Sequence, residues 1–170
     1  DSMIRLMKGP KGSKVKITVN RGGELIPFDI VRDRIPVHCV DAAFMIDDVT
    51  GYIKLSKFTR TTYREFTEAA DKLLSQGMKR LIFDLRDNTG GYFDQSWKLA
   101  NEFLQRGDGV VYMEGKNRPR QDFDADGRGM LKDIQISVLI NENTASSSEI
   151  FSGAIQDNDR GVIVGRRSFG

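Results

Sequence analysis

Two short segments of this 170-residue chain combine residue types that could supply a nucleophile and an anion-binding site. Residues 84–91 read Asp-Leu-Arg-Asp-Asn-Thr-Gly-Gly, and residues 141–149 read Asn-Glu-Asn-Thr-Ala-Ser-Ser-Ser-Glu. Each segment follows or ends a short apolar run that is typical of a buried strand. Ligands bind beyond the carboxyl ends of the strands of an α/β sheet. We therefore expect both segments at the edge of the sheet where a site would lie.

The glycines and serines of these segments suit covalent catalysis. Gly90 and Gly91 let the backbone approach a ligand closely and expose N–H groups. A serine at a helix start, such as Ser146, places its hydroxyl beside unpaired amides and the positive end of the helix dipole. A nucleophile and an oxyanion hole could thus both be present. However, a glycine pair can be a simple turn and a serine an N-cap, so these features alone leave catalysis open.

Composition excludes several other classes of function. The 26 basic and 24 acidic residues leave a net charge of only +2. The sequence also lacks a basic stripe interleaved with aromatic residues, so nucleic-acid binding is not predicted. No apolar run approaches the roughly 20 residues of a membrane-spanning helix. Cys39 is the only cysteine, which excludes an internal disulfide and predicts a buried, inert thiol. His38 is the only histidine, so neither a zinc site nor a Ser-His-Asp triad is expected, and no cofactor or metal is predicted.

The pattern of elements divides the chain in two. Residues 1–35 contain a helix end and one hairpin, which is too little for an independent core. Residues 36–170 alternate strands with helices, which predicts an α/β fold with a mostly parallel sheet. Strands are expected near 37–46, 51–55, 80–85, 109–113, 134–140 and 161–164, and helices from 62 to 76, after residue 91, and from 145 to 156.

Two local features are predicted between these elements. Thr62 and Glu65 fit a capping box for the first of the helices, and Gly77 fits its C-terminal end. Residues 114–132 are polar and poorly periodic, which predicts a long surface loop. Within it, Asp122, Asp124, Asp126 and Gly127, with Asp133 at the twelfth position, match part of a calcium-loop spacing. The twelfth residue is not Glu and no amphipathic helices flank the segment, so a solvated acidic loop is expected.

Several ordered motifs resemble the carboxy-terminal processing peptidases, the tail-specific serine proteases of the S41 class. The motifs are Gly51-Tyr52-Ile53, Asp84-Leu85-Arg86-x-Asn88-x-Gly90-Gly91, Thr144 to Ile150, Gln156-Asp157, and Val164-Gly165-x-x-Ser168-Phe169-Gly170. Residues 1–35 resemble the C-terminal part of the PDZ domain of these enzymes. The resemblance implies a crotonase/ClpP-like peptidase core over residues 36–170, preceded by a partial PDZ domain.

The resemblance also assigns the nucleophile. The serine loop of the family reads Ser-Ala-Ser-Ala-Ser-Glu, and its middle serine, the nucleophile, matches Ser146. Thr144 and Ser147 stand where that loop has serine and alanine. The backbone N–H of Ser147 and that of Gly91 or Gly90 would form the oxyanion hole, with Gly91 favoured.

Two acidic residues near this serine match or neighbour the family motif. Asp157 matches a family acid, for which we expect a structural rather than a catalytic role. Glu149 lies in the first turn of the predicted helix, where its charge would complement the helix dipole. Both are therefore treated as auxiliary residues.

The general base of the family is a lysine directly after Ser-Phe-Gly. Those three residues occupy positions 168–170 here, and no lysine follows Ser146. A serine hydroxyl needs a base, which a desolvated lysine of lowered pKa can be. Arg166 and Arg167 cannot replace it, because a guanidinium group does not lose its proton at accessible pH. We expect the lysine of a Ser-Lys dyad just beyond Gly170, and no useful peptidase activity in these 170 residues alone.

The resemblance implies polypeptide substrates, captured through their C-termini by strand addition, and export to the bacterial cell envelope, periplasmic or otherwise. Two alternatives stay open. One is a crotonase-type acyl-CoA enzyme, which uses a similar pair of amides without a serine nucleophile. The other is a non-catalytic peptide-binding module on the same fold. Cleavage preference, membrane anchoring and oligomeric state are left open by the sequence.

Overall fold

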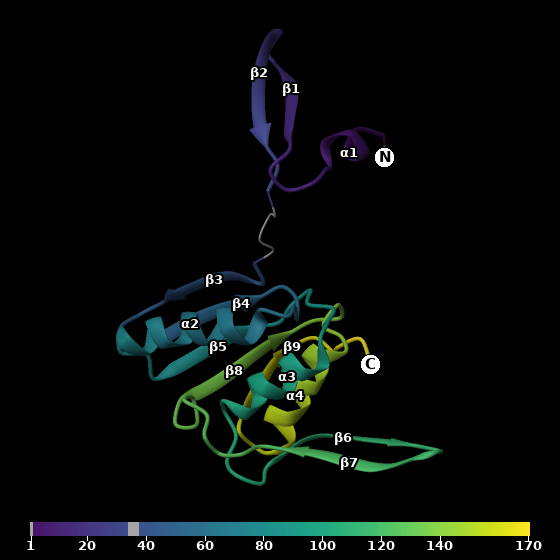
Figure 1. Ribbon diagram of the computed structural model, residues 1–170. Helices are drawn as coiled ribbons and strands as arrows, with labels where there is room; N and C mark the ends of the chain where they lie inside the picture. The colour runs from purple at the N-terminus through teal and green to yellow at the C-terminus, as the bar shows by residue number, and fades with distance from the viewer. Residues whose placement is uncertain (1, 34–37) are drawn as a thin grey trace. The chain divides into compact units, whose positions relative to one another are not determined.

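The computed structural model describes residues 2–33 and 38–170, and the chain divides into two compact units, Asp1–Val37 and His38–Gly170. The first unit contains α1 (Ser2–Met7) and an antiparallel hairpin of β1 (Lys14–Arg21) and β2 (Glu24–Val31) (Figure 1). Arg32, which follows β2, joins the hairpin to α1, because its guanidinium donates to the carbonyls of Leu6 and Met7 at 3.1 and 2.8 Å. The predicted helix end and hairpin are confirmed.

The second unit is built on a five-stranded sheet with the order β3-β4-β5-β8-β9. Antiparallel pairing joins β3 (Val40–Met45) to β4 (Thr50–Leu55), and the other neighbouring strands are parallel. The parallel strands that follow β4 are β5 (Arg80–Asp84), β8 (Gln135–Ile140) and β9 (Gly161–Gly165), and the helices between strands are α2 (Thr62–Ser75), α3 (Phe93–Asn101) and α4 (Ser147–Asp157). The predicted α/β fold with a mostly parallel sheet is confirmed.

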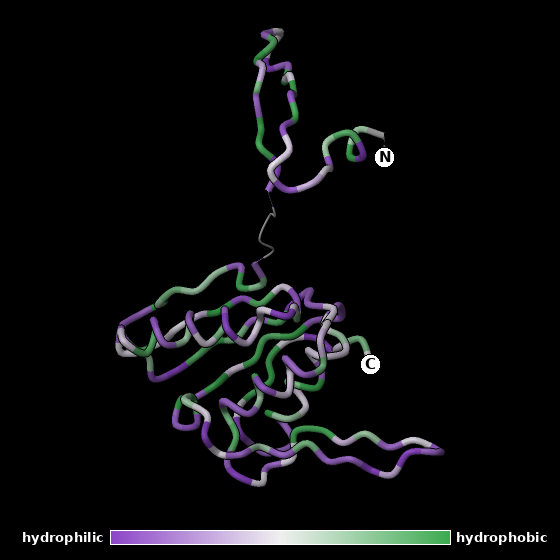
Figure 2. Tube along the Cα trace, viewed as in Figure 1, coloured by the Kyte–Doolittle hydropathy of each residue, from purple (hydrophilic) through white to green (hydrophobic). Residues whose placement is uncertain are grey.

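An aromatic cluster fixes the helices to the sheet. Phe83 of β5 contacts Phe66 of α2 and Phe151 of α4 edge to face, with ring centroids 5.1 and 5.0 Å apart. Phe103, just after α3, contacts both of these helix residues. Since Phe83 meets both helices, α2 and α4 pack on the same face of the sheet. Figure 2 shows apolar stretches in the central strands, next to helices in which hydrophilic and apolar residues alternate.

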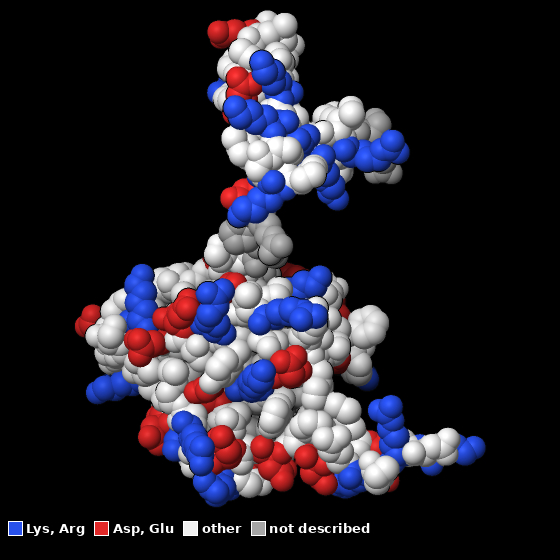
Figure 3. Space-filling model, viewed as in Figure 1, with Lys and Arg blue, Asp and Glu red and all other residues white. Residues whose placement is uncertain are grey.

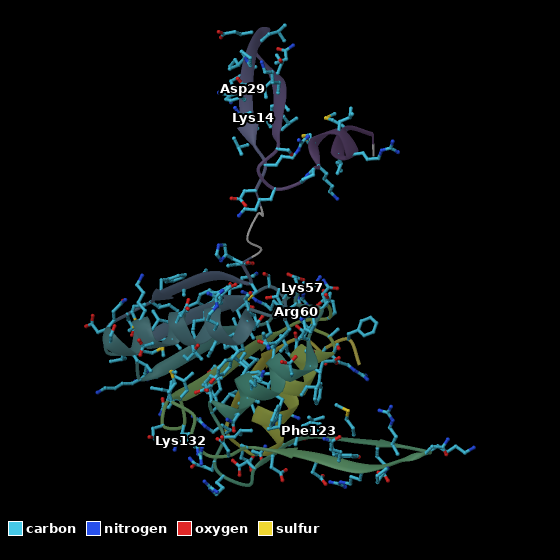
Figure 4. All side chains as sticks on the ribbon, viewed as in Figure 1. Lys14, Asp29, Lys57, Arg60, Phe123 and Lys132 are labelled. Carbon is cyan, nitrogen blue, oxygen red and sulfur yellow. The ribbon has the colours of Figure 1, made fainter. Side chains whose placement is uncertain are left out.

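The prediction of a long surface loop over residues 114–132 is wrong for its first half. Residues Gly109–Gly115 and Arg118–Asp124 form β6 and β7, an antiparallel hairpin that extends away from the helices (Figure 1). Phe123, labelled in Figure 4, fixes its base through ring contacts with Phe93 and Trp97, at 5.1 and 5.6 Å between centroids. The apolar anchor is a single residue in an otherwise polar strand, so no strand periodicity revealed it.

Part of the segment with calcium-loop spacing lies in the same hairpin. Asp122 and Asp124 lie in the extended strand β7, and Asp126 accepts hydrogen bonds from Asn101 Nδ2 and from the N–H of Arg128. A calcium loop must instead curl its alternate oxygens around one ion. Among the residues that the structure describes, no group of three or more His, Cys, Asp or Glu side chains is arranged to hold a metal.

The capping box predicted from Thr62 and Glu65 is also wrong. The N-cap of α2 is Thr61, and the Glu65 carboxylate accepts hydrogen bonds from Thr61 Oγ1 at 2.8 Å and from the N–H of Cys39 at 2.9 Å. Glu65 therefore ties α2 to the start of the sheet.

Cys39 is fully buried, and burial raises the pKa of its thiol, as expected for an inert cysteine. Gly77, with φ of 97°, ends the helix as predicted.

The surface carries charges of both signs. On the face shown in Figure 3, Lys and Arg side chains alternate with Asp and Glu side chains rather than forming one large basic field. Over residues 2–33 and 38–170, no helix is both long enough and apolar enough to cross a bilayer.

Candidate active site

Ser146 stands at the sharp turn between β8 and α4. It is the N-cap of α4, it has φ of 55° and ψ of −117°, and it is exposed. A positive φ in a residue with a side chain costs on the order of 1–3 kcal/mol and persists only where the surroundings enforce it. A strained strand-to-helix turn of this kind presents a serine hydroxyl to solvent, where a substrate can reach it.

The two segments identified in the sequence meet at this turn. A Cβ atom placed on Gly90 would lie 2.7 Å from the carbonyl oxygen of Ala145, 2.8 Å from the nitrogen of Ser147 and 2.9 Å from Cβ of Ser146. Gly90 also has φ of 92°. Only glycine fits, so the close approach of the two backbones depends on it.

Asn88 binds the two segments together. Its side chain is fully buried, donates to the carbonyl of Leu55 at 2.9 Å and accepts from the N–H of Gly90 at 2.9 Å. Its main-chain carbonyl accepts from the N–H of Ala145 and the hydroxyl of Ser148, at 3.1 and 3.0 Å. The sequence motif contains Asn88, but sequence reasoning gave it no role. An asparagine two residues before a glycine pair was the available signal, since it readily bonds the backbone two residues on.

A second set of contacts lies on the other side of the segments. The Asp87 carboxylate accepts from the side-chain amides of Asn141 and Asn143, both at 2.9 Å, and these bonds lower the pKa of Asp87. Thr144 Oγ1 donates to the carbonyl of Leu85 at 2.9 Å. The threonine that departs from the expected serine thus keeps a hydroxyl that holds the loop to the end of β5.

The turn at Gly90 and Gly91 leaves one of its amides unbonded. The N–H of Gly90 donates to Asn88, whereas the N–H groups of Gly91 and Ser147 make no hydrogen bond within the described residues. The carbonyl of Gly90 accepts from the N–H of Phe58 at 3.0 Å. Because carbonyl and N–H point in opposite directions across a trans peptide, the Gly91 N–H faces away from Phe58.

Glu149 connects Ser146 to the last residues of the chain. Its Oε2 accepts from the N–H of Ser146, and its Oε1 accepts from Ser168 Oγ and from the N–H of Gly170, all at 2.8 Å. Burial opposes ionisation of Glu149, but these hydrogen bonds outweigh it and lower its pKa below the usual value. Glu149 thus makes three hydrogen bonds, whereas sequence reasoning expected only an interaction with the helix dipole.

Asp157 lies apart from Ser146. It ends α4, whose rise of 1.5 Å per residue puts it about 15 Å along the axis from Ser147, the first residue of the helix. It borders a cavity of about 380 Å³ between α4 and the β6–β7 hairpin, together with Glu149 and Gly153. The structure records no hydrogen bond or ion pair for its side chain among the residues described, and it does not touch the serine.

Comparison with known sequences points to one family. The model of peptidase family S41 matches residues 49–170. A protein of Staphylococcus saprophyticus named "Probable CtpA-like serine protease" is 32% identical over all of this chain, and one of Staphylococcus aureus with the same name is 35% identical. In both cases this chain covers 34% of the relative. The chain thus spans about a third of the length of the curated relatives it matches.

Solved structures agree. The photosystem II D1 C-terminal processing protease is 28% identical, with a TM-score of 0.73 over 95% of this chain and 46% of that protein. A lipoprotein from Streptococcus agalactiae shares the fold at 18% identity, with a TM-score of 0.58 over 76% of this chain and 50% of that one. The family match covers both loops around Ser146 and the strands that carry them, and on these grounds the chain belongs to peptidase family S41.

Proposed function

We propose that the full-length protein is a serine endopeptidase of the C-terminal processing type, which hydrolyses peptide bonds through an acyl-enzyme on Ser146. One observation carries this proposal. The exposed Ser146 stands at the start of α4 beside the N–H groups of Gly91 and Ser147, which are unbonded within the described residues. These are the parts that acyl transfer needs, a nucleophile and donors for a developing oxyanion.

The reaction proceeds in two halves. Ser146 Oγ attacks the peptide carbonyl carbon while a base takes its proton, and the resulting oxyanion accepts hydrogen bonds from the two amides. Each such donor is typically worth about 3 kcal/mol in the transition state. As the intermediate collapses and its C–N bond breaks, the base gives the proton to the leaving amine, and water then attacks the acyl-enzyme with the same base taking its proton.

The base we propose is a lysine that follows Gly170 in the full-length protein. Supporting this, one carboxylate, that of Glu149, accepts from the N–H groups of both Ser146 and Gly170, so that a continuation of the chain starts beside the nucleophile. No lysine follows Ser146 within these 170 residues. We therefore propose that residues 1–170 alone are inactive. Peptide cleavage by the pure 170-residue chain that disappears in Ser146→Ala would contradict this.

The test of the nucleophile uses the full-length protein and a fluorophosphonate probe. Labelling is expected at Ser146, and Ser146→Ala should abolish both labelling and peptide cleavage. Ser75→Ala, which removes an exposed hydroxyl at the end of α2, is the matched control and should change neither. CoA-dependent turnover, or peptide binding without labelling of Ser146, would overturn the proposal in favour of an acyl-CoA enzyme or a binding module.

We further propose that residues 1–35 are the C-terminal part of a PDZ-like domain that captures substrate C-termini, and that residues 36–170 form a crotonase/ClpP-like core. The proposal that residues 1–35 capture peptides is supported by a groove of about 740 Å³ between α1 and the hairpin. The groove is bordered by Ile4, Met7, Val15 and Ile17. Peptides with a free C-terminal carboxylate should bind the full-length protein more tightly than their amides. Equal affinity would contradict carboxylate capture.

The cellular location is proposed on the family alone. We infer that the protein is exported and acts in the bacterial cell envelope. Fractionation of the native host with an antiserum against this chain should find it in the envelope or periplasmic fraction. Its recovery in the cytoplasmic fraction would contradict this inference.

A further inference from the structure

We propose that the side chain of Ser147 is a positioning residue, which holds the two amides of the oxyanion hole at a fixed separation. This inference rests on the proposed function, in which the N–H groups of Ser147 and Gly91 stabilise the oxyanion. The Ser147 hydroxyl donates to the carbonyl of Gly91 at 3.0 Å, and the residue is 1% exposed. Ser147 thus provides one donor through its backbone and holds the residue that provides the other.

Gly91 needs such a restraint. It has φ of 148°, in a region that residues with side chains rarely adopt, and it follows another glycine. A glycine pair has the greatest backbone freedom of any dipeptide, so its N–H groups do not keep a direction without contacts. A donor that must be reoriented during the reaction contributes less than one that is already aimed.

The contacts of Gly91 come from two separate elements. On one side the segment at Phe58 holds both flanking peptides, since its N–H donates to Gly90 O at 3.0 Å and its carbonyl accepts from the N–H of Tyr92 at 2.9 Å. On the other side stands the Ser147 hydroxyl. Among the residues described, this is the one hydrogen bond that joins Gly91 to α4, the helix that begins directly after the nucleophile.

Removal of this bond should therefore act on the transition state. Without it Gly91 stays attached to the Phe58 segment, but its distance from the Ser147 N–H is no longer set by a direct contact. The oxyanion, which exists only after attack on the substrate carbonyl, would lose alignment of its donors. Ground-state binding of the substrate does not involve the oxyanion, so binding should change little.

The experiment compares Ser147→Ala with Ser152→Ala in the full-length protein. Ser147→Ala keeps the backbone N–H and removes the tie. Ser152→Ala removes another buried hydroxyl of α4, which donates to the carbonyl of Ser148 at 2.8 Å and does not touch the 90–91 turn. Fluorophosphonate labelling counts correctly folded sites, so that kcat is expressed per labelled site even if part of the variant protein misfolds.

For Ser147→Ala, kcat per labelled site should fall about five- to twentyfold, as expected for the loss of one aligned hydrogen bond, with KM changed less than twofold. Affinity for a peptide boronic acid, which mimics the tetrahedral intermediate, should weaken by the same factor as kcat/KM. Ser152→Ala should stay within twofold of the parent in both measurements.

The outcomes separate the two proposals. An unchanged kcat in Ser147→Ala, with Ser146→Ala inactive, overturns the positioning role and leaves the nucleophile in place. An equal fall in Ser147→Ala and Ser152→Ala also overturns it, because the effect would then come from α4 in general. Retained activity in Ser146→Ala overturns the proposed function itself.

Discussion

Three consecutive serines at the start of α4 make different contacts. Ser146 is exposed, Ser147 donates to the carbonyl of Gly91, and Ser148 is fully buried and donates to the carbonyl of Asn88. A serine-rich helix start is ambiguous in sequence, since each hydroxyl could cap the helix. The backbone of the neighbouring segment distinguishes them, because its carbonyls accept hydrogen bonds from the second and third hydroxyls and not from the first.

Glu149 should stabilise the site in a pH-dependent way. Its pKa is lowered on folding, so its contribution is complete above the unfolded value of about 4.5 and is lost as the pH falls through the folded pKa. Glu149→Gln is expected to reduce the free energy of unfolding by about 2 kcal/mol at pH 7, because it removes charge-assisted hydrogen bonds. The difference from the parent chain should narrow below pH 4.5.

Urea unfolding of both chains at pH 7, 5 and 3.5 measures this difference. Glu114→Gln, an exposed change in β6, is the control. A difference that is constant down to pH 3.5 would contradict the prediction.

The ionised carboxylate of Glu65 should also stabilise the fold in a pH-dependent way, and by more than that of Glu149. Burial opposes its ionisation, but hydrogen bonds from the Cys39 N–H and Thr61 Oγ1 lower its pKa to about 2, and its side chain is 12% exposed. Since the folded pKa lies below 4.5, the carboxylate stabilises the fold fully above pH 4.5, by about 3 kcal/mol, and progressively less down to pH 2. Glu65→Gln should lose most of this at pH 7 by urea unfolding. Glu68→Gln, on the exposed side of α2, should change stability by less than about 0.5 kcal/mol.

At the scale of elements, the site depends on where glycine is required and where it is not. A Cβ on Gly91 would lie 2.0 Å from the carbonyl oxygen of Phe58, where no side chain fits. Gly153, in the middle of α4, would meet nothing within 4 Å if it carried a Cβ. The first glycine permits the close pairing of the 90–91 turn with the Phe58 segment, whereas the second is not demanded by packing.

Replacement of the two glycines by alanine should therefore change the stability of the chain in opposite directions. Gly91→Ala is expected to destabilise the chain by more than about 2 kcal/mol, through backbone strain and loss of the pairing with Phe58. Gly153→Ala should stabilise it by up to about 1 kcal/mol, because alanine is the better helix former. Guanidinium unfolding of the 170-residue chain compares them, and stabilisation by Gly91→Ala would show that the close approach is not required.

For the molecule as a whole, stability is concentrated in the unit His38–Gly170. Among the residues that the structure describes, the buried aliphatic and aromatic core lies in this unit, whereas residues 3–33 contain no fully buried side chain. In α1 and β2, large apolar side chains such as Leu6, Leu25 and Val31 are exposed. A hairpin and a short helix bury too little surface to offset their conformational entropy.

We therefore expect residues 38–170 to fold without the first unit. Their free energy of unfolding should lie within about 1 kcal/mol of that of the 170-residue chain, because residues 3–33 bury no side chain fully and so contribute little hydrophobic stabilisation. Chemical denaturation followed by fluorescence of Trp97 gives the comparison. A loss of several kcal/mol on removal of residues 1–37 would show that the first unit supports the core.

The sequence by itself determined the α/β alternation, the parallel strands and the two segments at the edge of the sheet. Strand and helix periodicity is local, and the rule that sites lie beyond the strand ends needs only the order of elements. The resemblance to S41 peptidases was confirmed for the same reason, since its motifs are short and ordered along the chain.

Contacts between residues distant in sequence were decided only by the tertiary structure. Arg160 donates to the carbonyls of Phe103, Leu131, Lys132 and Ile134, from two separate segments, and no local pattern marks that role. The same holds for Phe123 at the base of the hairpin and for Glu65 with Cys39. It holds most for Ser147 and Gly91, 56 residues apart. Such hydrogen bonds depend on backbone groups that every residue has, so residue type alone cannot specify them.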